Sequence, residues 1–218
     1  VSTGRVPTPG LCVCDFKGLF TPAKHGGETS VIAFKLPNSG FVHEVYLKRQ
    51  TVVAAVDAFD EFRDLVRVRF GIIVDKLLFD RDTAFNKAFR RALLAPERDV
   101  CPDMSGAYDH YELGSIETYW DVWQTLVAAF LLHGKKDESH WKFAAKMANH
   151  ILMRLPTSAN PGFISPMEAL TNETPDFSDF IAPFSPSFVT QEVTGSLSTH
   201  AREGFFCGYP EYTTPGVW

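Results

Sequence analysis

Three acidic residues lie where carboxylates could hold metal ions. Asp15 closes a short apolar run, Asp80 directly follows another, and Glu117 opens a long helical pattern. In-line displacement at phosphorus by a water or a DNA hydroxyl requires charge to be neutralised on the entering and leaving oxygens. Two divalent cations about 4 Å apart can do this when carboxylates on rigid elements hold them. The three acids are therefore candidate ligands of a two-metal site.

Each acid taken alone also has a structural explanation. An Asp after a strand is often a turn residue, and a Glu in the first turn of a helix often caps it or stabilises its dipole. Glu117 precedes Trp120 by three residues and Trp123 by six. Helical geometry therefore predicts that Glu117 faces the sheet with the buried stripe rather than solvent, where it would need a partner such as a metal ion. Only the joint arrangement favours a functional site.

The elements that would position these acids alternate between strands and helices. Three apolar runs separated by turn residues predict a β-meander over 11–16, 31–34 and 41–47. The apolar period then becomes helical over 51–67, where Gly71 ends the helix. A buried strand over 76–79 runs straight into Asp80.

The second half of the chain is predicted to be mainly helical. The expected elements are a helix over 85–94 with basic residues outside, an irregular stretch over 95–114, helices over 116–132 and 139–153, a linker over 156–190 and a strand-like end over 204–209. Gly134 is expected to cap the long helix. This order of elements predicts an α/β domain with a mixed sheet covered by helices.

Composition bounds the class of protein. With 218 residues, 45% of them hydrophobic, and a net charge of −5, the chain can form a domain of about 150 residues and a smaller appendage, and disorder is excluded. No apolar run of about 18 residues is present, so no membrane span is expected. The first residues carry neither Met nor a signal-peptide pattern, which is interpreted as an excised piece of a larger product.

The four cysteines predict no disulfide and no zinc site. Cys12, Cys14, Cys101 and Cys207 include no CxxC pair, and the histidines near the first two have no zinc-ligand spacing. Reduced, buried thiols in an intracellular protein are expected.

Several motifs resemble a known family. Asp80 and Glu117 are separated by 36 residues, which is similar to the Asp–Glu spacing of retroviral and retrotransposon integrases, and the local sequence agrees best with copia-type elements. The motifs that carry the resemblance follow in family order over nearly the whole chain: 14–20 (CDFKGLF), 77–85 (LLFDRDTAF), 114–117 (GSIE), 141–157 (WKFAAKMANHILMRLPT), 165–170 (SPMEAL), 174–178 (TPDFS) and 201–209 (AREGFFCGY).

The resemblance implies a ribonuclease H-like fold, in which a five-stranded mixed sheet lies between helices, with a short β-rich extension at the C-terminal end. It implies an N-terminal linker over 1–10, an integrase catalytic core over 11–172, and a linker with part of a small β-barrel over 173–218. The implied function is trimming of the element's 3′ ends and their joining to target DNA, with an endonuclease activity as a variant of the same chemistry.

The resemblance also implies cofactors and partners. Two Mg²⁺ or Mn²⁺ ions are expected, one held by Asp15 and Asp80 and the other by Asp15 and Glu117. The expected partners are the element's DNA ends, target DNA and further copies of the chain, with no membrane. The expected location is intracellular, and nuclear during action on chromosomal DNA.

Some positions depart from the family pattern. Asp82 replaces a Gly, Ala84 a Glu, Leu113 an Asn and Thr118 an Arg, so Asp82 or Glu112 could also take part in the site. The pI of 5.8 neither supports nor excludes a DNA-binding enzyme. Nucleic-acid domains are usually basic, but acidic active sites that bind metal ions are a common exception. Residues 118–132 contain no Lys or Arg, so phosphate contacts are expected from other domains or from basic residues elsewhere in the chain. The candidates, each of which could equally be a solvated surface residue, are Lys17, Lys24, Lys87, Arg90 and Arg91.

Two alternatives therefore stay open. The chain could be a catalytically inactive scaffold, derived from an integrase, that binds nucleic acid or protein. It could also be a ribonuclease H-like nuclease that hydrolyses DNA ends without joining them.

Overall fold

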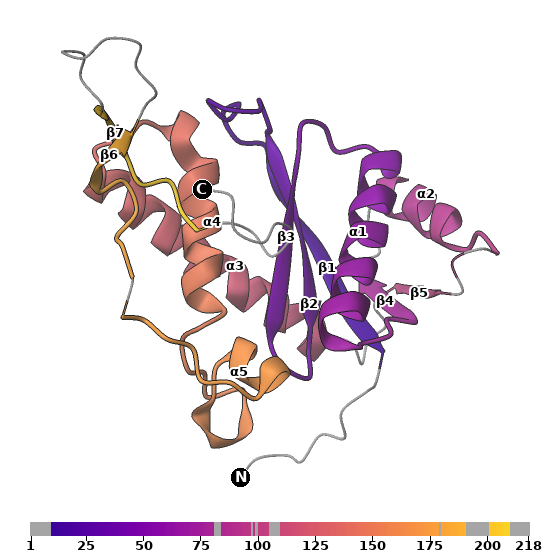
Figure 1. Cartoon of the computed structure of the whole chain (residues 1–218). Helices are drawn as coiled ribbons and strands as arrows, with labels where there is room; N and C mark the ends of the chain where they lie inside the picture. The colour runs from indigo at the N-terminus through magenta and orange to yellow at the C-terminus, as the bar shows by residue number, and fades with distance from the viewer. Residues whose placement is uncertain are drawn as a thin grey trace.

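A five-stranded mixed sheet forms the centre of the molecule (Figure 1). The computed structural model describes residues 10–80, 84–96, 98, 100–104, 110–178, 180–190 and 201–209. The strand order is β3-β2-β1-β4-β5, with β1, β2 and β3 antiparallel and β4 and β5 parallel to β1. The predicted sheet is confirmed, and its strands are β1 (Leu11–Gly18), β2 (Ser30–Leu36), β3 (Phe41–Leu47), β4 (Lys76–Phe79) and β5 (Cys101–Met104).

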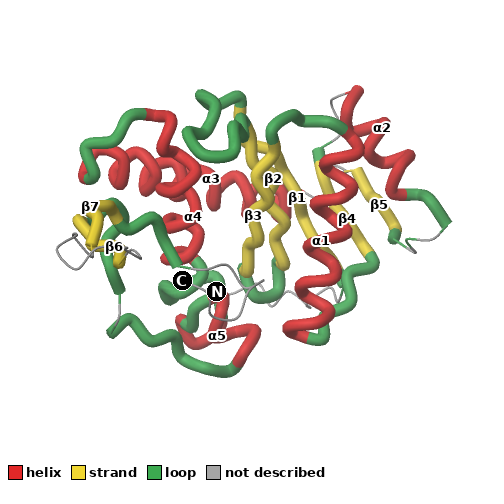
Figure 2. The backbone as a smooth tube through the Cα atoms, turned by 45° about the horizontal axis from the view of Figure 1, so that its top comes forward, coloured by secondary structure: helices red, strands yellow, loops and turns green. Residues whose placement is uncertain are grey.

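Helices cover both faces of the sheet (Figures 1 and 2). Helices α1 (Val52–Phe70) and α2 (Ala84–Leu93) lie on one face, and α3 (His110–His133) and α4 (Trp141–Leu152) lie on the other. The result is a three-layer α/β domain, as the sequence pattern predicts.

The alternation of side chains along β1 separates the two faces of the sheet. Cys14 pairs with Phe34 on β2, and the ring of Phe34 stacks on Phe62 of α1 with centroids 5.1 Å apart. The next side chain along β1, Asp15, points the other way and bonds Trp120 of α3. The polar residue of this strand therefore lies beneath α3.

The ends of α1 follow from local chemistry. The Thr51 side chain accepts a hydrogen bond from the Ala54 backbone amide and caps the first turn. Gly71 adopts φ 67°, and its amide bonds the last helical carbonyls, which ends the helix where the sequence predicts.

An irregular stretch is predicted over 95–114, and this prediction is wrong in its middle and at its C-terminal end. β5 pairs in parallel with β4 through residues that include Pro102, so the pairing partner rather than strand propensity defines it. Helix α3 begins at His110 and continues through Gly114, which the sequence pattern treats as a break. Residues 105–109 lie outside the described part of the chain.

The interval 156–190 contains more structure than a linker. Ser165 caps a short helix, α5 (Pro166–Thr171), by accepting a hydrogen bond from the Glu168 amide. The same interval contains the 3₁₀ turn η2 (Pro161–Phe163) and the strand β6 (Pro186–Thr190). A further 3₁₀ turn, η1 (Glu138–His140), lies outside this interval and precedes α4.

A two-stranded antiparallel sheet forms the C-terminal extension and packs beside α4. Its strands are β6 and β7 (Ala201–Phe205), so the predicted terminal strand begins and ends earlier than expected. Lys136 lies 3.7 Å from the centre of the Phe205 ring, and Tyr209 stacks on His150 of α4 with centroids 4.4 Å apart. The expected β-rich extension is present and is anchored by aromatic contacts.

All four cysteines are free. Burial raises the pKa of the Cys12 and Cys14 thiols well above the ordinary value, so both stay protonated and unreactive. Cys101 is exposed and Cys207 half-buried, which corrects the expectation that every thiol is buried. Cys101 begins β5, which is the last strand of the sheet among the described residues.

The structure does not describe every residue on which a prediction was made. Residues 1–9 of the expected N-terminal linker and Asp82 lie outside the described residues. None of the helices described here combines the length and apolar character that a membrane crossing requires.

Candidate active site

Asp15 of the central strand β1 lies near Asp80, which directly follows β4. β1 and β4 are parallel, and Val13 pairs with Leu78. Asp15 lies two residues beyond Val13 but inside β1, which continues to Gly18 and does not end at Asp15 as predicted. Asp80 directly follows β4, and its charge acts on the Asp15 carboxyl. Asp15 lies on the sheet face that α3 covers, where it bonds Trp120.

The surroundings of Asp15 make its negative charge costly. Partial burial raises the pKa of the Asp15 carboxyl above its ordinary value, and the nearby charge of Asp80 raises it further. The Phe16 amide, the Trp120 indole and Lys17 act in the opposite direction without cancelling the shift. A divalent cation between the two acids would remove this cost.

Two donors hold the Asp15 carboxylate. The Phe16 backbone amide donates to Oδ1 at 2.8 Å, and the Trp120 indole Nε1 donates to Oδ2 at 3.0 Å. The sequence predicts burial of Trp120 from helical period but not this bond. The sequence feature that could have indicated the bond is the position of Trp120 three residues after Glu117 on the same helix.

Glu117 differs from its prediction in two respects. It lies two turns inside α3 rather than at the start, and its side chain is exposed rather than packed with the buried stripe. On the helix, Tyr119 contacts Glu44 of β3 and Trp120 contacts Asp15 of β1. Continuing around the helix in the same sense, Glu117 lies on the flank nearer β4, the strand that Asp80 directly follows.

Asp15 and Asp80 offer a divalent cation a pair of neighbouring carboxylates. Carboxylate oxygens are the hard ligands that Mg²⁺ and Mn²⁺ prefer. Among the side chains that the structure describes, no group of three or more His, Cys, Asp or Glu residues is arranged to hold a metal ion. Glu117 is thus not grouped with Asp15 and Asp80, and the side chains of Asp82 and Glu112 lie outside the described set.

A second carboxylate beneath α3 has different surroundings. Glu44 of β3 is buried and accepts hydrogen bonds from the hydroxyls of Tyr46 and Tyr119, the latter at 2.5 Å. The Tyr119 hydroxyl also lies 3.1 Å from Asn149 Oδ1 of α4. Burial, followed by the Glu44 charge, raises the Tyr119 pKa well above its ordinary value, so this hydroxyl remains a donor. The cluster ties α3 to β3 and α4.

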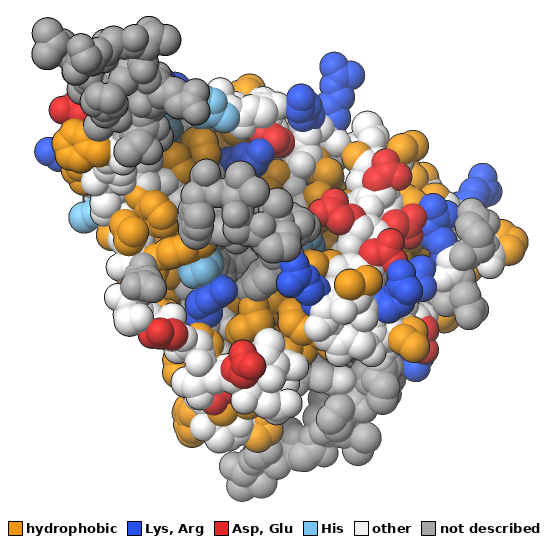
Figure 3. Space-filling model, viewed as in Figure 1, with side chains coloured by type: hydrophobic (Ala, Val, Ile, Leu, Met, Phe, Trp, Pro, Cys, Tyr) orange, Lys and Arg blue, Asp and Glu red, His pale blue; other side chains and the backbone are white. Residues whose placement is uncertain are grey.

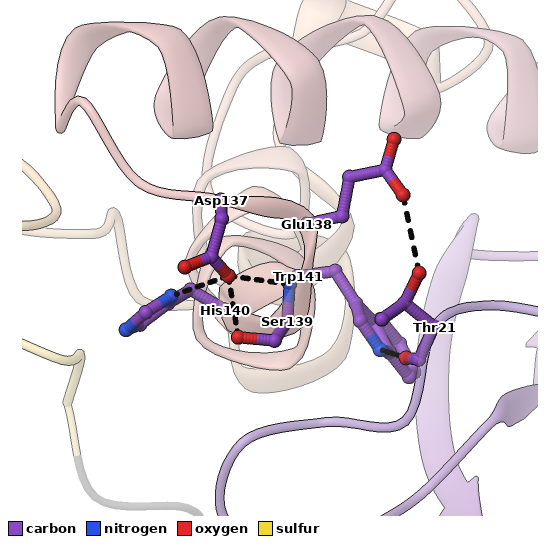
Figure 4. Close-up of polar contacts among 6 residues, drawn as sticks. All are labelled: Thr21, Asp137, Glu138, Ser139, His140 and Trp141. Carbon is purple, nitrogen blue, oxygen red and sulfur yellow. Dashed lines mark hydrogen bonds and ion pairs between the residues drawn. The ribbon is translucent and has the colours of Figure 1, made fainter.

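The segment after β1 is fastened to the start of α4 (Figure 4). The Trp141 indole donates to the Thr21 carbonyl at 2.8 Å, and the Thr21 hydroxyl donates to Glu138 at 3.1 Å. In the same turn, Asp137 accepts bonds from the Ser139 hydroxyl and amide, which lower its pKa to about 2. These contacts fix the strand that carries Asp15 relative to the helices above it.

The basic side chains expected to meet phosphates differ in exposure. Lys17 is half-buried on β1 and the others are exposed. The outer face of α1 carries interspersed acidic and basic side chains (Figure 3). On α4, Lys142 forms a 2.6 Å ion pair with Glu28. Of the basic residues expected to meet phosphates, Lys17 is near enough to Asp15 for its charge to lower the pKa of that carboxyl.

Solved structures with the same arrangement identify the architecture. The BIV integrase catalytic core domain aligns with a TM-score of 0.55 and 16% identity over 76% of this chain and 95% of that one. The fold is that of a retroviral integrase catalytic core. The HTLV-2 integrase catalytic core, solved as a trimeric form with magnesium, aligns with a TM-score of 0.55 and 17% identity, covering 76% and 99% of the two chains.

A chain from a larger assembly is similar to this structure as well. A chain of the simian T-cell lymphotropic virus intasome, solved in complex with PP2A regulatory subunit B56 gamma, aligns with a TM-score of 0.57 and 13% identity over 92% of this chain and 69% of that one. No protein-family model matches the chain, and no curated protein matches it by sequence. At these identities the likeness concerns the fold.

Proposed function

We propose that this chain is a metal-dependent polynucleotidyl transferase that trims the 3′ ends of retroelement DNA and joins them to target DNA. The observation that carries the proposal is the proximity of Asp15, within β1, to Asp80, directly after the parallel neighbour β4, in an integrase-core fold. Two like charges placed side by side, one of them partly buried, cost stability unless a cation joins them.

Each acid has a defined part in the proposal. Asp15 and Asp80 hold one Mg²⁺ or Mn²⁺ ion, and Asp15 with Glu117 holds the second. Bound metal would activate the hydroxyl nucleophile and neutralise the leaving oxygen. Glu117 is assigned as the third ligand because it is exposed on the flank of α3 that follows Trp120 toward β4. Trp120 holds Asp15 in place.

The partners follow from the same activity. Joining two DNA ends requires element DNA, target DNA and an assembly of several copies, and action on chromosomal DNA occurs in the nucleus. The intasome and the trimeric magnesium complex among the structural neighbours support DNA, oligomer and metal as partners. The copia-type motifs support a catalytic core over 11–172, followed by a linker and part of a small β-barrel over 173–218.

A strand-transfer assay tests the proposal. The chain is incubated with a short duplex carrying a recessed 3′ end and a plasmid target, in Mg²⁺ or in Mn²⁺. Asp15→Asn, Asp80→Asn and Glu117→Gln should each abolish joining while leaving the circular dichroism spectrum unchanged. Asp57→Asn, an exposed acid on α1 at the opposite layer, is the matched control and should transfer normally. Transfer retained by Glu117→Gln would remove Glu117 from the mechanism.

A non-catalytic scaffold is the second candidate. It is favoured by the absence of Lys and Arg from residues 118–132 and by the lack of a three-acid group among the described side chains. Under this alternative the wild-type chain binds DNA or protein but joins no ends in either metal. Analysis of the same products separates a third candidate, a nuclease, because hydrolysed ends without joined ends would identify it.

A further inference from the structure

The Asp15 carboxylate is restrained at both oxygens. Oδ1 accepts from the Phe16 amide and Oδ2 from the Trp120 indole. The terminal torsion of an aspartate is normally broad, so two donors on opposite oxygens fix the plane of this carboxylate. Each oxygen can accept two bonds, and each therefore keeps capacity for a metal ion.

The donor on α3 is itself held firmly. Trp120 is 2% exposed and packs between the rings of Tyr119 and Trp123, each 5.3 Å away by centroid. Tyr119 is anchored through its hydroxyl to Glu44. The indole N–H therefore keeps its direction when a ligand enters the site.

We infer that Trp120 is a positioning residue that sets the affinity of the Asp15–Asp80 pair for a divalent cation by aiming the Asp15 carboxylate. The inference rests on the proposed function and names a residue through which that function is tuned. Donors that orient a metal-ligating side chain from behind commonly change metal affinity by about 10- to 100-fold when they are removed.

A neighbouring tryptophan separates this role from packing. Trp123 lies one turn along the same helix and is 1% exposed, but its indole Nε1 has no hydrogen-bond partner among the residues that the structure describes. Trp120→Phe and Trp123→Phe each replace an indole by a phenyl ring in one aromatic cluster. Only the first removes a bond to Asp15.

The test measures metal binding directly. Mn²⁺ is titrated into the wild-type chain and both variants by calorimetry, and thermal unfolding is recorded for each without metal. We expect Trp120→Phe to weaken Mn²⁺ binding about 10- to 100-fold and Trp123→Phe to leave it near wild type, while both variants lose comparable thermal stability. Equal Mn²⁺ affinities for Trp120→Phe and wild type would overturn the inference and leave the proposed function standing.

Two further measurements keep the outcomes distinct. If Trp120→Phe does not fold, 3-benzothienylalanine introduced at position 120 replaces only the N–H by sulfur, and the same loss of Mn²⁺ affinity is expected. Asp15→Asn gives the baseline without a site. If the wild-type chain binds Mn²⁺ no better than Asp15→Asn, the metal site of the proposed function and the role of Trp120 are both wrong, whereas a wild-type signal unaffected at position 120 contradicts Trp120 alone.

Discussion

Asp15 and Glu44 lie in one row across the sheet, but the residues that surround the two carboxylates differ. Asp15 of β1 pairs with Ala33 of β2, which pairs with Glu44 of β3. Consecutive residues of α3 contact them, Trp120 at Asp15 and Tyr119 at Glu44. The same helix turn therefore covers two carboxylates, with one strand between them.

Their neighbours set the two carboxylates apart. Glu44 is buried and accepts from two tyrosine hydroxyls, which satisfy it within the protein. Asp15 is only partly buried and lies beside a second acid. A carboxylate beneath a helix is thus structural when donors surround it, and a candidate metal ligand when a like charge and solvent border it.

The largest expected contrast between the two sites is in catalysis. Asp15→Asn should lower strand transfer by about 1,000-fold or more, which is a loss of ~4 kcal/mol of transition-state stabilisation, because a ligand of the metal is gone. Glu44→Gln should keep transfer per folded molecule within about tenfold of wild type. Transfer rates normalised to the folded fraction measure both. An equal loss of strand transfer in Asp15→Asn and Glu44→Gln would show that the two carboxylates do not differ in their contribution to catalysis.

The second contrast is stabilisation by metal. Mg²⁺ at 100 times its dissociation constant should raise the free energy of unfolding of the wild-type chain by about 2.7 kcal/mol, because only the folded chain presents Asp15 beside Asp80. Urea unfolding with and without Mg²⁺ measures this gain. Asp80→Asn should lose it, and Tyr46→Phe, which alters the Glu44 site, should keep it.

The third contrast is structural stability without metal. Tyr119→Phe removes a hydroxyl that bonds a buried carboxylate, so the free energy of unfolding should fall by about 2 kcal/mol. Metal affinity should stay close to that of wild type. Chemical denaturation in EDTA and an Mn²⁺ titration report the two quantities, and a variant with normal stability would show that Glu44 does not depend on Tyr119.

The smallest contrast is a pH dependence that belongs to Asp15. Its pKa in the folded chain lies above the ordinary value of 3.8, so its contribution favours the folded state at low pH and is lost as pH rises through the folded pKa. In EDTA, Asp15→Asn should therefore gain stability relative to wild type as pH rises from about 4 to 7. A constant difference across that range would contradict the raised pKa, and adding Mg²⁺ should reverse the advantage.

The sheet and most helices could be predicted because their signals are local. Apolar alternation defines β1 to β3, and the helical period with Gly71 defines α1. β5 could not be predicted, because a strand of four residues with Pro102 is defined by its pairing with β4 and not by propensity. Gly114 indicates a helix break, yet the contacts of the turns on either side carry α3 across it.

The site was only partly predictable for a related reason. The proximity of Asp15 and Asp80 could be anticipated because each follows an apolar run on one of two parallel neighbouring strands, although β1 continues past Asp15 to Gly18. Trp120 as a donor could not, because a period of 3.6 reports which side chains are buried and not which polar atom each one meets. The exposure of Glu117 depends on the rotation of α3, which the Tyr119–Glu44 bond helps to set.

The bond between Trp120 and Asp15 also couples a chromophore to the candidate ligand. Three of the chain's four tryptophans, Trp120, Trp123 and Trp141, line the space around Phe20 and Asp15. Indole emission responds to nearby charge, so a cation arriving at Asp15 would alter the field across the Trp120 ring before any DNA is present. The molecule thus contains its own optical reporter for the site.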